Sequence, residues 1–221
     1  MSAVYLDIET FPADPSAWEP KEPISAPATY KDPDKIAAYV AEKRTEQHQR
    51  TGFDVHAGRL LCAAVAVNDG PVRVSYDRSL ANPAPVLDAV AAAIREALSD
   101  GRGRVTVVGH NIAGFDAPWL WRLAVRERHE LATLLPYRKW GEGLADTMAM
   151  WSATNPREMI GLATIARFLG VGAKGEGMSG AEVWPAYLRG EHERIRDYCA
   201  QDVELVREVY RRITHPTGAP F

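Results

Sequence analysis

The stretch Tyr5-Leu6-Asp7-Ile8-Glu9-Thr10 decides how the rest of the chain is interpreted. Its hydrophobic residues predict a β-strand, in which successive side chains point to opposite faces. Asp7 and Glu9 therefore share a face, where two like charges repel and raise each other's pKa. Strands are depleted in Asp, so the pair is costly unless a cation lies between the carboxylates. Two interpretations stay open: a divalent metal site, or an edge strand with two surface acids.

The composition is that of a globular protein with one domain. The chain has 221 residues, 46% hydrophobic and 25% charged, with a net charge of −3. This charge argues against a broad basic surface that coats duplex nucleic acid, although a local cleft is compatible with it. A strand over residues 3–9 leaves no room for a signal peptide, and no apolar run reaches the ~18 residues of a membrane span. We expect a cytoplasmic protein with a single domain over residues 1–221, in which Cys62 and Cys199 are buried thiols.

The order of the expected elements indicates an α/β fold. The hydrophobic patterns predict strands at 3–9, 59–67, 72–76, 105–108 and 145–148. Apolar residues at helical spacing predict helices at 85–98, 118–127, 162–169, 181–189 and 192–213. Asp69-Gly70 marks a hairpin turn between the second and third strands, and the glycine-rich segment 171–180 is expected to be a loop. We predict a mixed five-stranded sheet flanked by helices.

Residues 11–56 form a predicted insertion after the first strand, because they are far too many for a hairpin loop. Prolines are dense up to Ala28 and predict an extended segment, and Pro33 then begins a polar helix that ends near Gln49. The insertion could alter substrate choice. Five basic residues of the insertion could contact phosphates, although a solvated helix face is the commoner role of such charges. These residues are Lys31, Lys35, Lys43, Arg44 and Arg50.

Polar residues in unusual places occur again later in the chain. Asp116 stands where a strand gives way to a helix, a common place for a capping carboxylate. Asn111, five residues before Asp116, suits a turn in the left-handed conformation. Asp202 lies within the apolar stripe of the last helix, so it faces a cleft, binds a cation or pairs with an arginine. Tyr198, one turn earlier, is either a core aromatic or a group that reaches what Asp202 reaches.

Three motifs occur in order: Asp7-Ile8-Glu9 on a strand, the segment from Asn111 to Asp116 between a strand and a helix, and the segment from Tyr198 to Asp202 in a late helix. Together they resemble the proofreading 3′–5′ exonucleases of the DnaQ-like superfamily, which have a ribonuclease H-like fold. Asn-x-x-x-Phe-Asp and Tyr-x-x-x-Asp are most similar to the exonuclease domains of family B DNA polymerases. A related subgroup has a histidine five residues before the last acid. Here that residue is Asp197, so the chain resembles the DEDDy type, with four acids and a tyrosine.

The resemblance implies that Asp7, Glu9, Asp116 and Asp202 hold two divalent cations, Mg²⁺ or Mn²⁺, with Asp7 touching both. Two such ions about 3.5–4 Å apart can activate a water and stabilise the leaving 3′-oxygen. Hard oxygen ligands suit these ions, and the sequence offers no cluster of His or Cys for zinc. The resemblance also gives Tyr198 the role of orienting the attacking water, since a phenol with a pKa of about 10 is a poor general base.

The resemblance further implies that Thr10, Phe11, Asn111 and Phe115 contact the terminal nucleotide. We expect a metal-dependent 3′–5′ exonuclease, a phosphodiester hydrolase that acts on single-stranded DNA or frayed 3′ ends and releases nucleoside monophosphates. It would serve proofreading, DNA replication or DNA repair, with a polymerase or replication complex as its partner in trans. Two alternatives remain: a 3′–5′ exoribonuclease on the same scaffold, and a catalytically silent nucleic-acid-binding module.

Overall fold

The computed structural model describes residues 2–100, 103–138, 141–153, 155, 158–172 and 178–217. Residues 173–177 of the predicted glycine-rich loop lie outside this part of the chain. The chain forms two compact units. The sheet unit contains Met1–Glu9 and Leu61–Phe221, and the insertion unit contains Thr10–Leu60.

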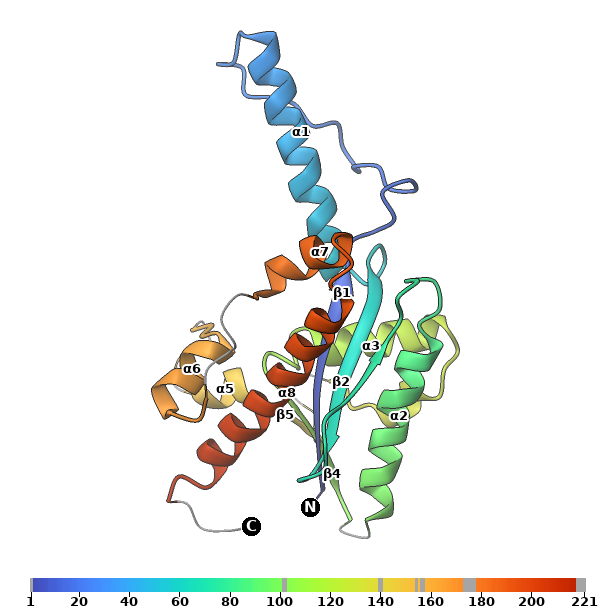
Figure 1. Cartoon of the computed structure of the whole chain (residues 1–221), viewed down its shortest axis with the longest axis vertical. Helices are drawn as coiled ribbons and strands as arrows, with labels where there is room; N and C mark the ends of the chain where they lie inside the picture. Colours follow the sequence, from blue (N-terminus) through green and yellow to red (C-terminus); the bar gives the residue numbers. More distant parts are fainter. Residues whose placement is uncertain are drawn as a thin grey trace. The chain divides into compact units, whose positions relative to one another are not determined.

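A five-stranded sheet with the order β3-β2-β1-β4-β5 places β1 in the centre (Figure 1). The strands are β1 (Ser2–Phe11), β2 (Arg59–Val67), β3 (Arg73–Tyr76), β4 (Val105–Gly109) and β5 (Leu144–Asp146). β4 runs parallel to both β1 and β5, whereas β2 and β3 are antiparallel. The predicted mixed five-stranded sheet is therefore confirmed.

The hairpin from β2 to β3 is also confirmed, and its turn ties the hairpin to the central strand. Gly70 donates a backbone hydrogen bond to Val67 across the turn. The Asn68 side chain accepts from the Ala3 amide at 2.9 Å, and the Asn68 amide donates to the Ala3 carbonyl at 2.9 Å. Because Asn68 follows the end of β2 and Ala3 lies near the start of β1, these two neighbouring strands run in opposite directions.

Helices flank the sheet, and α8 and α2 each contact β3 and β4 (Figure 1). Helix α8 contacts α5, α6 and α7, whereas α4 contacts both α2 and α3. The helices of the sheet unit are α2 (Ala84–Ser99), α3 (Asp116–Arg126), α4 (Leu131–Leu134), α5 (Thr147–Trp151), α6 (Leu162–Leu169), α7 (Gly180–Leu188) and α8 (His192–Thr214).

The alternation of side chains along β1 separates its core face from its polar face. Val4 and Leu6 are fully buried on one face, each contributing about 1.5–3 kcal/mol of hydrophobic stabilisation. On the opposite face the ring of Tyr5 packs edge-on against Tyr210 of α8, with centroids 6.1 Å apart. Asp7 and Glu9 continue that second face, so α8 is the helix that these carboxylates meet.

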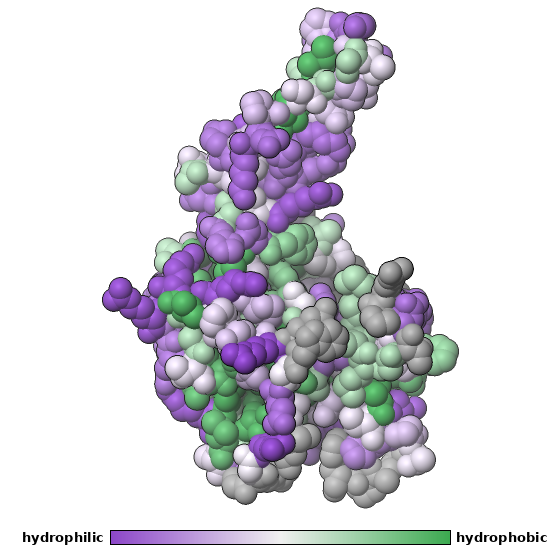
Figure 2. Space-filling view, turned by 180° about the vertical axis from the view of Figure 1, so that it is seen from behind, coloured by the Kyte–Doolittle hydropathy of each residue, from purple (hydrophilic) through white to green (hydrophobic). Residues whose placement is uncertain are grey.

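The insertion unit carries the predicted helix, α1 (Pro33–Arg50), which has Asp32 as its N-cap and no buried residue. In Figure 2, hydrophilic residues prevail on the visible face of the insertion unit, with some hydrophobic residues among them at its tip. Contacts inside the unit close its base. The Ala13 amide donates to Thr51 Oγ1 at 2.8 Å, and Thr10 Oγ1 donates to the Gly52 carbonyl at 2.7 Å. The chain therefore enters and leaves the insertion unit at adjacent points.

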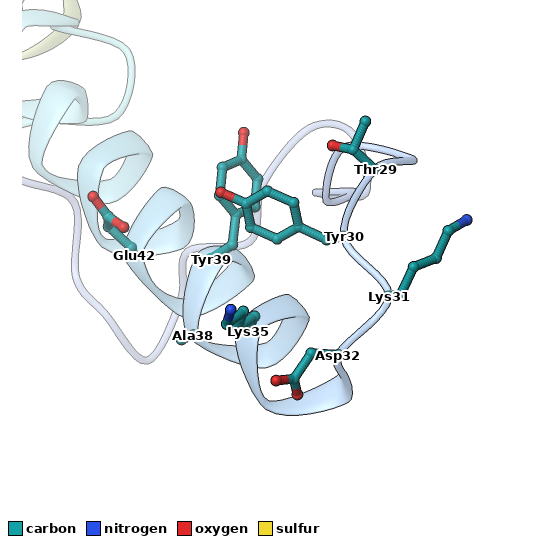
Figure 3. Close-up of a pocket in the computed structure, with 8 residues that line it drawn as sticks. All are labelled: Thr29, Tyr30, Lys31, Asp32, Lys35, Ala38, Tyr39 and Glu42. Atoms are coloured by element: carbon teal, nitrogen blue, oxygen red, sulfur yellow. The ribbon is translucent and has the colours of Figure 1, made fainter.

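A cavity of about 570 Å³ lies beside α1 in the insertion unit (Figure 3). The rings of Tyr30 and Tyr39 pack edge-to-face in it, 5.6 Å apart. Its charged lining is balanced: two lysines and two acids. These lining residues are Lys31, Lys35, Asp32 and Glu42.

Two of the other basic residues of the insertion form ion pairs within the unit. Lys43 pairs with Glu46 at 2.7 Å, and Arg44 pairs with Glu19 at 2.8 Å. Together with the balanced lining of the cavity, these pairs favour the solvated-face interpretation of the basic residues over a phosphate-binding surface.

We predict that the sheet unit folds without most of the insertion. Replacing residues 17–46 with a short Gly/Ser linker keeps His48, Thr51 and Gly52, which close the base, and removes most of a helix that has no buried residue. The variant should keep a cooperative thermal transition with Tm within about 5 °C of the full chain, measured by circular dichroism. Ile195→Asp, at a fully buried position of α8, is the destabilised control. Loss of the cooperative transition in the deletion variant would contradict the prediction.

Candidate active site

Three carboxylates come together where the end of β1 meets α8. Ligand oxygens of Asp7, Glu9 and Asp202 all lie within 4.8 Å of one another. Asp7 and Glu9 are half-buried, and Asp202 is buried, with 5% of its surface exposed. Three acids at this spacing repel one another, and they present the hard oxygen donors that Mg²⁺ and Mn²⁺ prefer. The cluster can therefore hold a metal ion.

Asp116 is held beside this cluster by the main chain of β1. It is the first residue of α3 and is buried, and its Oδ1 accepts a hydrogen bond from the Ile8 amide at 3.2 Å. Burial raises the pKa of Asp116 to about 7; the carboxylates of Asp146 and Asp202 also raise it, while backbone amides lower it. Among the described residues the 4.8 Å cluster contains only the other three acids. The structure thus anchors Asp116 at the residue between Asp7 and Glu9.

Tyr198 lies one turn before Asp202 on α8 and is buried, with 8% of its surface exposed. Burial raises the pKa of its hydroxyl most, and the carboxylates of Asp202, Glu9 and Asp7 raise it further. The hydroxyl donates a hydrogen bond to Asp202, which holds the proton on the phenol. Tyr198 is therefore a hydrogen-bond donor among carboxylates.

Cys199 of α8 contacts Asp7, and sequence reasoning missed this contact. Its Sγ lies 3.5 Å from Asp7 Oδ2 and donates a weak hydrogen bond. A hydrogen bond with Cys62 and burial both raise the pKa of the Cys199 thiol. Both cysteines are buried and unoxidised, as the sequence predicted.

The turn from β4 to α3 has the conformation predicted for Asn111. Asn111 is left-handed, with φ of 60°, and its carbonyl accepts from the amides of Gly114 and Phe115 at 3.0 and 2.9 Å. A Cβ on Gly114 would lie 2.4 Å from Asn111 Oδ1, so a larger residue there would displace the Asn111 side chain. Phe115 is half-buried and precedes α3. The turn-residue interpretation of Asn111 is thus confirmed.

Thr10 and Phe11 follow Glu9 along β1 and belong to the insertion unit. The Thr10 hydroxyl is engaged with the Gly52 carbonyl, and the Phe11 side chain is fully buried. In this conformation Phe11 does not present its ring for stacking on a base.

Asp146 is a further residue of the site region that sequence reasoning missed. Its carboxylate accepts from the amides of Asn111 and Ala113, at 2.9 and 3.1 Å, and it also caps α5. The sequence predicts a strand over 145–148, but β5 ends at Asp146 and α5 begins at Thr147. An Asp directly before apolar residues at helical spacing is an N-cap signal, and it could have identified this boundary.

A protein-family comparison agrees with the motifs. The model of a family described as a predicted 3′–5′ exonuclease related to the exonuclease domain of PolB matches residues 101–219, more than half of the chain. The chain belongs to this family. The matched region of this exonuclease-family chain includes Asn111, Phe115, Asp116, Tyr198 and Asp202, whereas Asp7 and Glu9 precede it.

Comparison with solved structures supports the fold. The family B DNA polymerase from the hyperthermophilic archaeon Pyrobaculum calidifontis superposes with a TM-score of 0.63 and 16% sequence identity. The match covers 96% of this chain and 24% of the polymerase, so the chain spans about a quarter of that protein. The ribonuclease H-like fold predicted from the sequence is confirmed.

No curated protein sequence matches the chain significantly. Among the helices of the described residues, none has the length and apolar character needed to cross a membrane.

We predict that Asp116 destabilises the metal-free protein. Above its raised pKa the carboxylate is charged and buried beside other acids, whereas Asn keeps the oxygen that accepts from Ile8. In EDTA at pH 8, Asp116→Asn should raise the free energy of unfolding by about 1–2 kcal/mol, measured by urea denaturation. Asp197→Asn, at an exposed position of α8, is the matched control and should have little effect. A less stable Asp116→Asn protein would show that hydrogen bonds to the carboxylate outweigh its burial.

Proposed function

We propose that this chain is a metal-dependent 3′–5′ exonuclease that hydrolyses single-stranded DNA or frayed 3′ ends to nucleoside monophosphates in the cytoplasm. The observation that carries the proposal is the cluster of Asp7, Glu9 and Asp202 within 4.8 Å, with Asp116 anchored at Ile8. Membership of a predicted exonuclease family supports the same chemistry.

The carboxylates of Asp7, Glu9, Asp116 and Asp202 are the groups that would hold two divalent cations, Mg²⁺ or Mn²⁺. Bound there, the two ions would supply activation of a water and stabilisation of the leaving 3′-oxygen. The resemblance to the proofreading exonucleases implies that Asp7 would be a ligand of both ions. The repulsion among the acids is the cost of keeping these ligands in place before a cation binds.

Tyr198 would orient the attacking water. Burial and the neighbouring carboxylates raise the pKa of its hydroxyl, which favours the protonated phenol and a role in orienting the water over removal of its proton. A protonated phenol on the same helix as Asp202 can hold a water in line by a hydrogen bond.

The terminal nucleotide would be contacted by Asn111 and Phe115, which the β4–α3 turn presents next to Asp116. Thr10 and Phe11 would contribute through their main chain, given that the Phe11 ring is buried. We propose that a polymerase or replication complex supplies the substrate in trans, as the likeness to a polymerase fold suggests.

We predict digestion from the 3′ end. A 5′-labelled single-stranded DNA should shorten in single-nucleotide steps with Mg²⁺ or Mn²⁺, a 3′-labelled strand should release labelled mononucleotide first, and EDTA should stop both reactions.

Asp7→Ala should abolish cleavage because every metal contact through Asp7 is lost, while Asp197→Asn should remain active. A cleavage rate of the Asp7→Ala variant above a few per cent of wild type would contradict the two-metal assignment. Faster digestion of a matched RNA would indicate the exoribonuclease, and binding without cleavage would indicate a silent module.

We predict that Tyr198→Phe lowers kcat by about 10–10³-fold, the range expected when one positioned contact is lost. The Mg²⁺ concentration for half-maximal rate and KM should stay within about twofold of wild type, because the hydroxyl is not a ligand. Tyr210→Phe, at another buried tyrosine of α8, is the matched control and should retain full kcat. A large rise in the Mg²⁺ requirement of Tyr198→Phe would make Tyr198 a structural part of the metal site.

A further inference from the structure

The carboxylate of Asp146 connects two elements through four backbone amides. Its Oδ1 accepts from Asn111 at 2.9 Å, from Met148 at 3.0 Å and from Ala149 at 3.3 Å. Its Oδ2 accepts from Ala113 at 3.1 Å. Met148 and Ala149 belong to the first turn of α5, so these two bonds are ordinary capping. The other two reach across from β5 to the β4–α3 turn, and capping does not require them.

Those two bonds fix a turn that leads directly to Asp116. Parallel pairing of β4 and β5 places Gly109 opposite Asp146, so the turn begins beside the carboxylate. The Asn111 amide donates to Asp146 while the Asn111 carbonyl accepts from Gly114 and Phe115, which keeps this residue in its left-handed conformation. Asp116 directly follows Phe115, and its carboxylate accepts a hydrogen bond from the Ile8 amide.

An ionised carboxylate suits this position because it offers two oxygens that only accept. The four amides that surround it are all donors. A neutral side chain with one oxygen can cap α5 or hold the turn, but it cannot satisfy all four donors at once. The residue is half-buried, so an amide left without its partner is only partly solvated.

We propose that Asp146 is a positioning residue for the exonuclease reaction. It holds the β4–α3 turn so that Asp116 reaches the metal site and Asn111 and Phe115 meet the terminal nucleotide. This inference rests on the proposed function, although the part that concerns the turn can be measured without any catalytic assay.

Asp146→Ser separates the two roles of the residue. Serine is a favourable N-cap, so α5 keeps its capping hydroxyl, but one short side chain cannot also reach both Asn111 and Ala113. Asp146→Asn is the milder variant, since it keeps the shape and one accepting oxygen but turns an NH₂ group toward an amide donor. Asp32→Ser is the matched control, because Asp32 caps α1 through Asp34 in the insertion unit and makes no bond to the turn.

The test combines amide hydrogen exchange with steady-state kinetics. In Asp146→Ser the amides of Asn111, Ala113 and Gly114 should exchange at least about 10-fold faster than in wild type, whereas those of α5 change little. With Tm close to wild type, kcat should fall by about 10–10²-fold and the Mg²⁺ concentration for half-maximal rate should rise by at least about threefold. Asp146→Asn should give smaller changes in the same direction, and Asp32→Ser should give none.

Unchanged exchange at Asn111 and Ala113 would overturn the inference. Faster exchange with unchanged kcat and Mg²⁺ requirement would also overturn it, by showing that the reaction does not depend on the turn. If the wild-type chain cleaves no nucleic acid, the proposed function fails, while the exchange rates still decide whether Asp146 holds the turn. Should Asp146→Ser unfold, the same measurements on the nearly isosteric Asp146→Asn decide the question.

Discussion

The structure depends on keeping like charges together at the end of its central strand. Asp7 and Glu9 share a face of β1, and Asp202 of α8 brings a third carboxylate within 4.8 Å of both. Repulsion alone would spread these groups, so the strand and helix must be fixed by other interactions. Burial of Val4 and Leu6 anchors one face of β1, and the contact of Tyr5 with Tyr210 anchors the other to α8. The apolar half of the strand thus stabilises the charged half.

The second constraint acts through the main chain. Asp116 is held by the Ile8 amide, and the turn that carries Asp116 is held by Asp146. Cys199 adds a thiol donor to Asp7 from the helix that bears Asp202. Asp7 and Asp116 are therefore restricted by neighbouring residues, and these neighbours come from β1, β5 and α8. Such a network resists the collapse or separation of the acids that their charges would otherwise cause.

Local periodicity explains which parts were predictable from the sequence. The two-residue period of a strand placed Asp7 and Glu9 on one face, and the four-residue step of a helix placed Tyr198 with Asp202. The apolar runs predicted the strands, and Gly170, left-handed with φ of 65°, ends α6 where the pattern stopped. The bonds from Asp116 to Ile8 and from Asp146 to Asn111 join residues 108 and 35 positions apart, and no local pattern encodes them. The burial of Phe11 likewise depends on tertiary packing, which the sequence motif did not reveal.

The closed base of the insertion unit has a consequence for how such a chain can change over time. Thr10 bonds to Gly52 and Ala13 to Thr51, so the segment between them is bounded by two adjacent points of the backbone. The entropy of closing a loop rises only slowly with its length, so a longer, shorter or different segment would cost the junction little. Recombination or protein engineering could therefore replace the segment between these two points with a different one, while the strand that carries Asp7 and Glu9 stays unchanged.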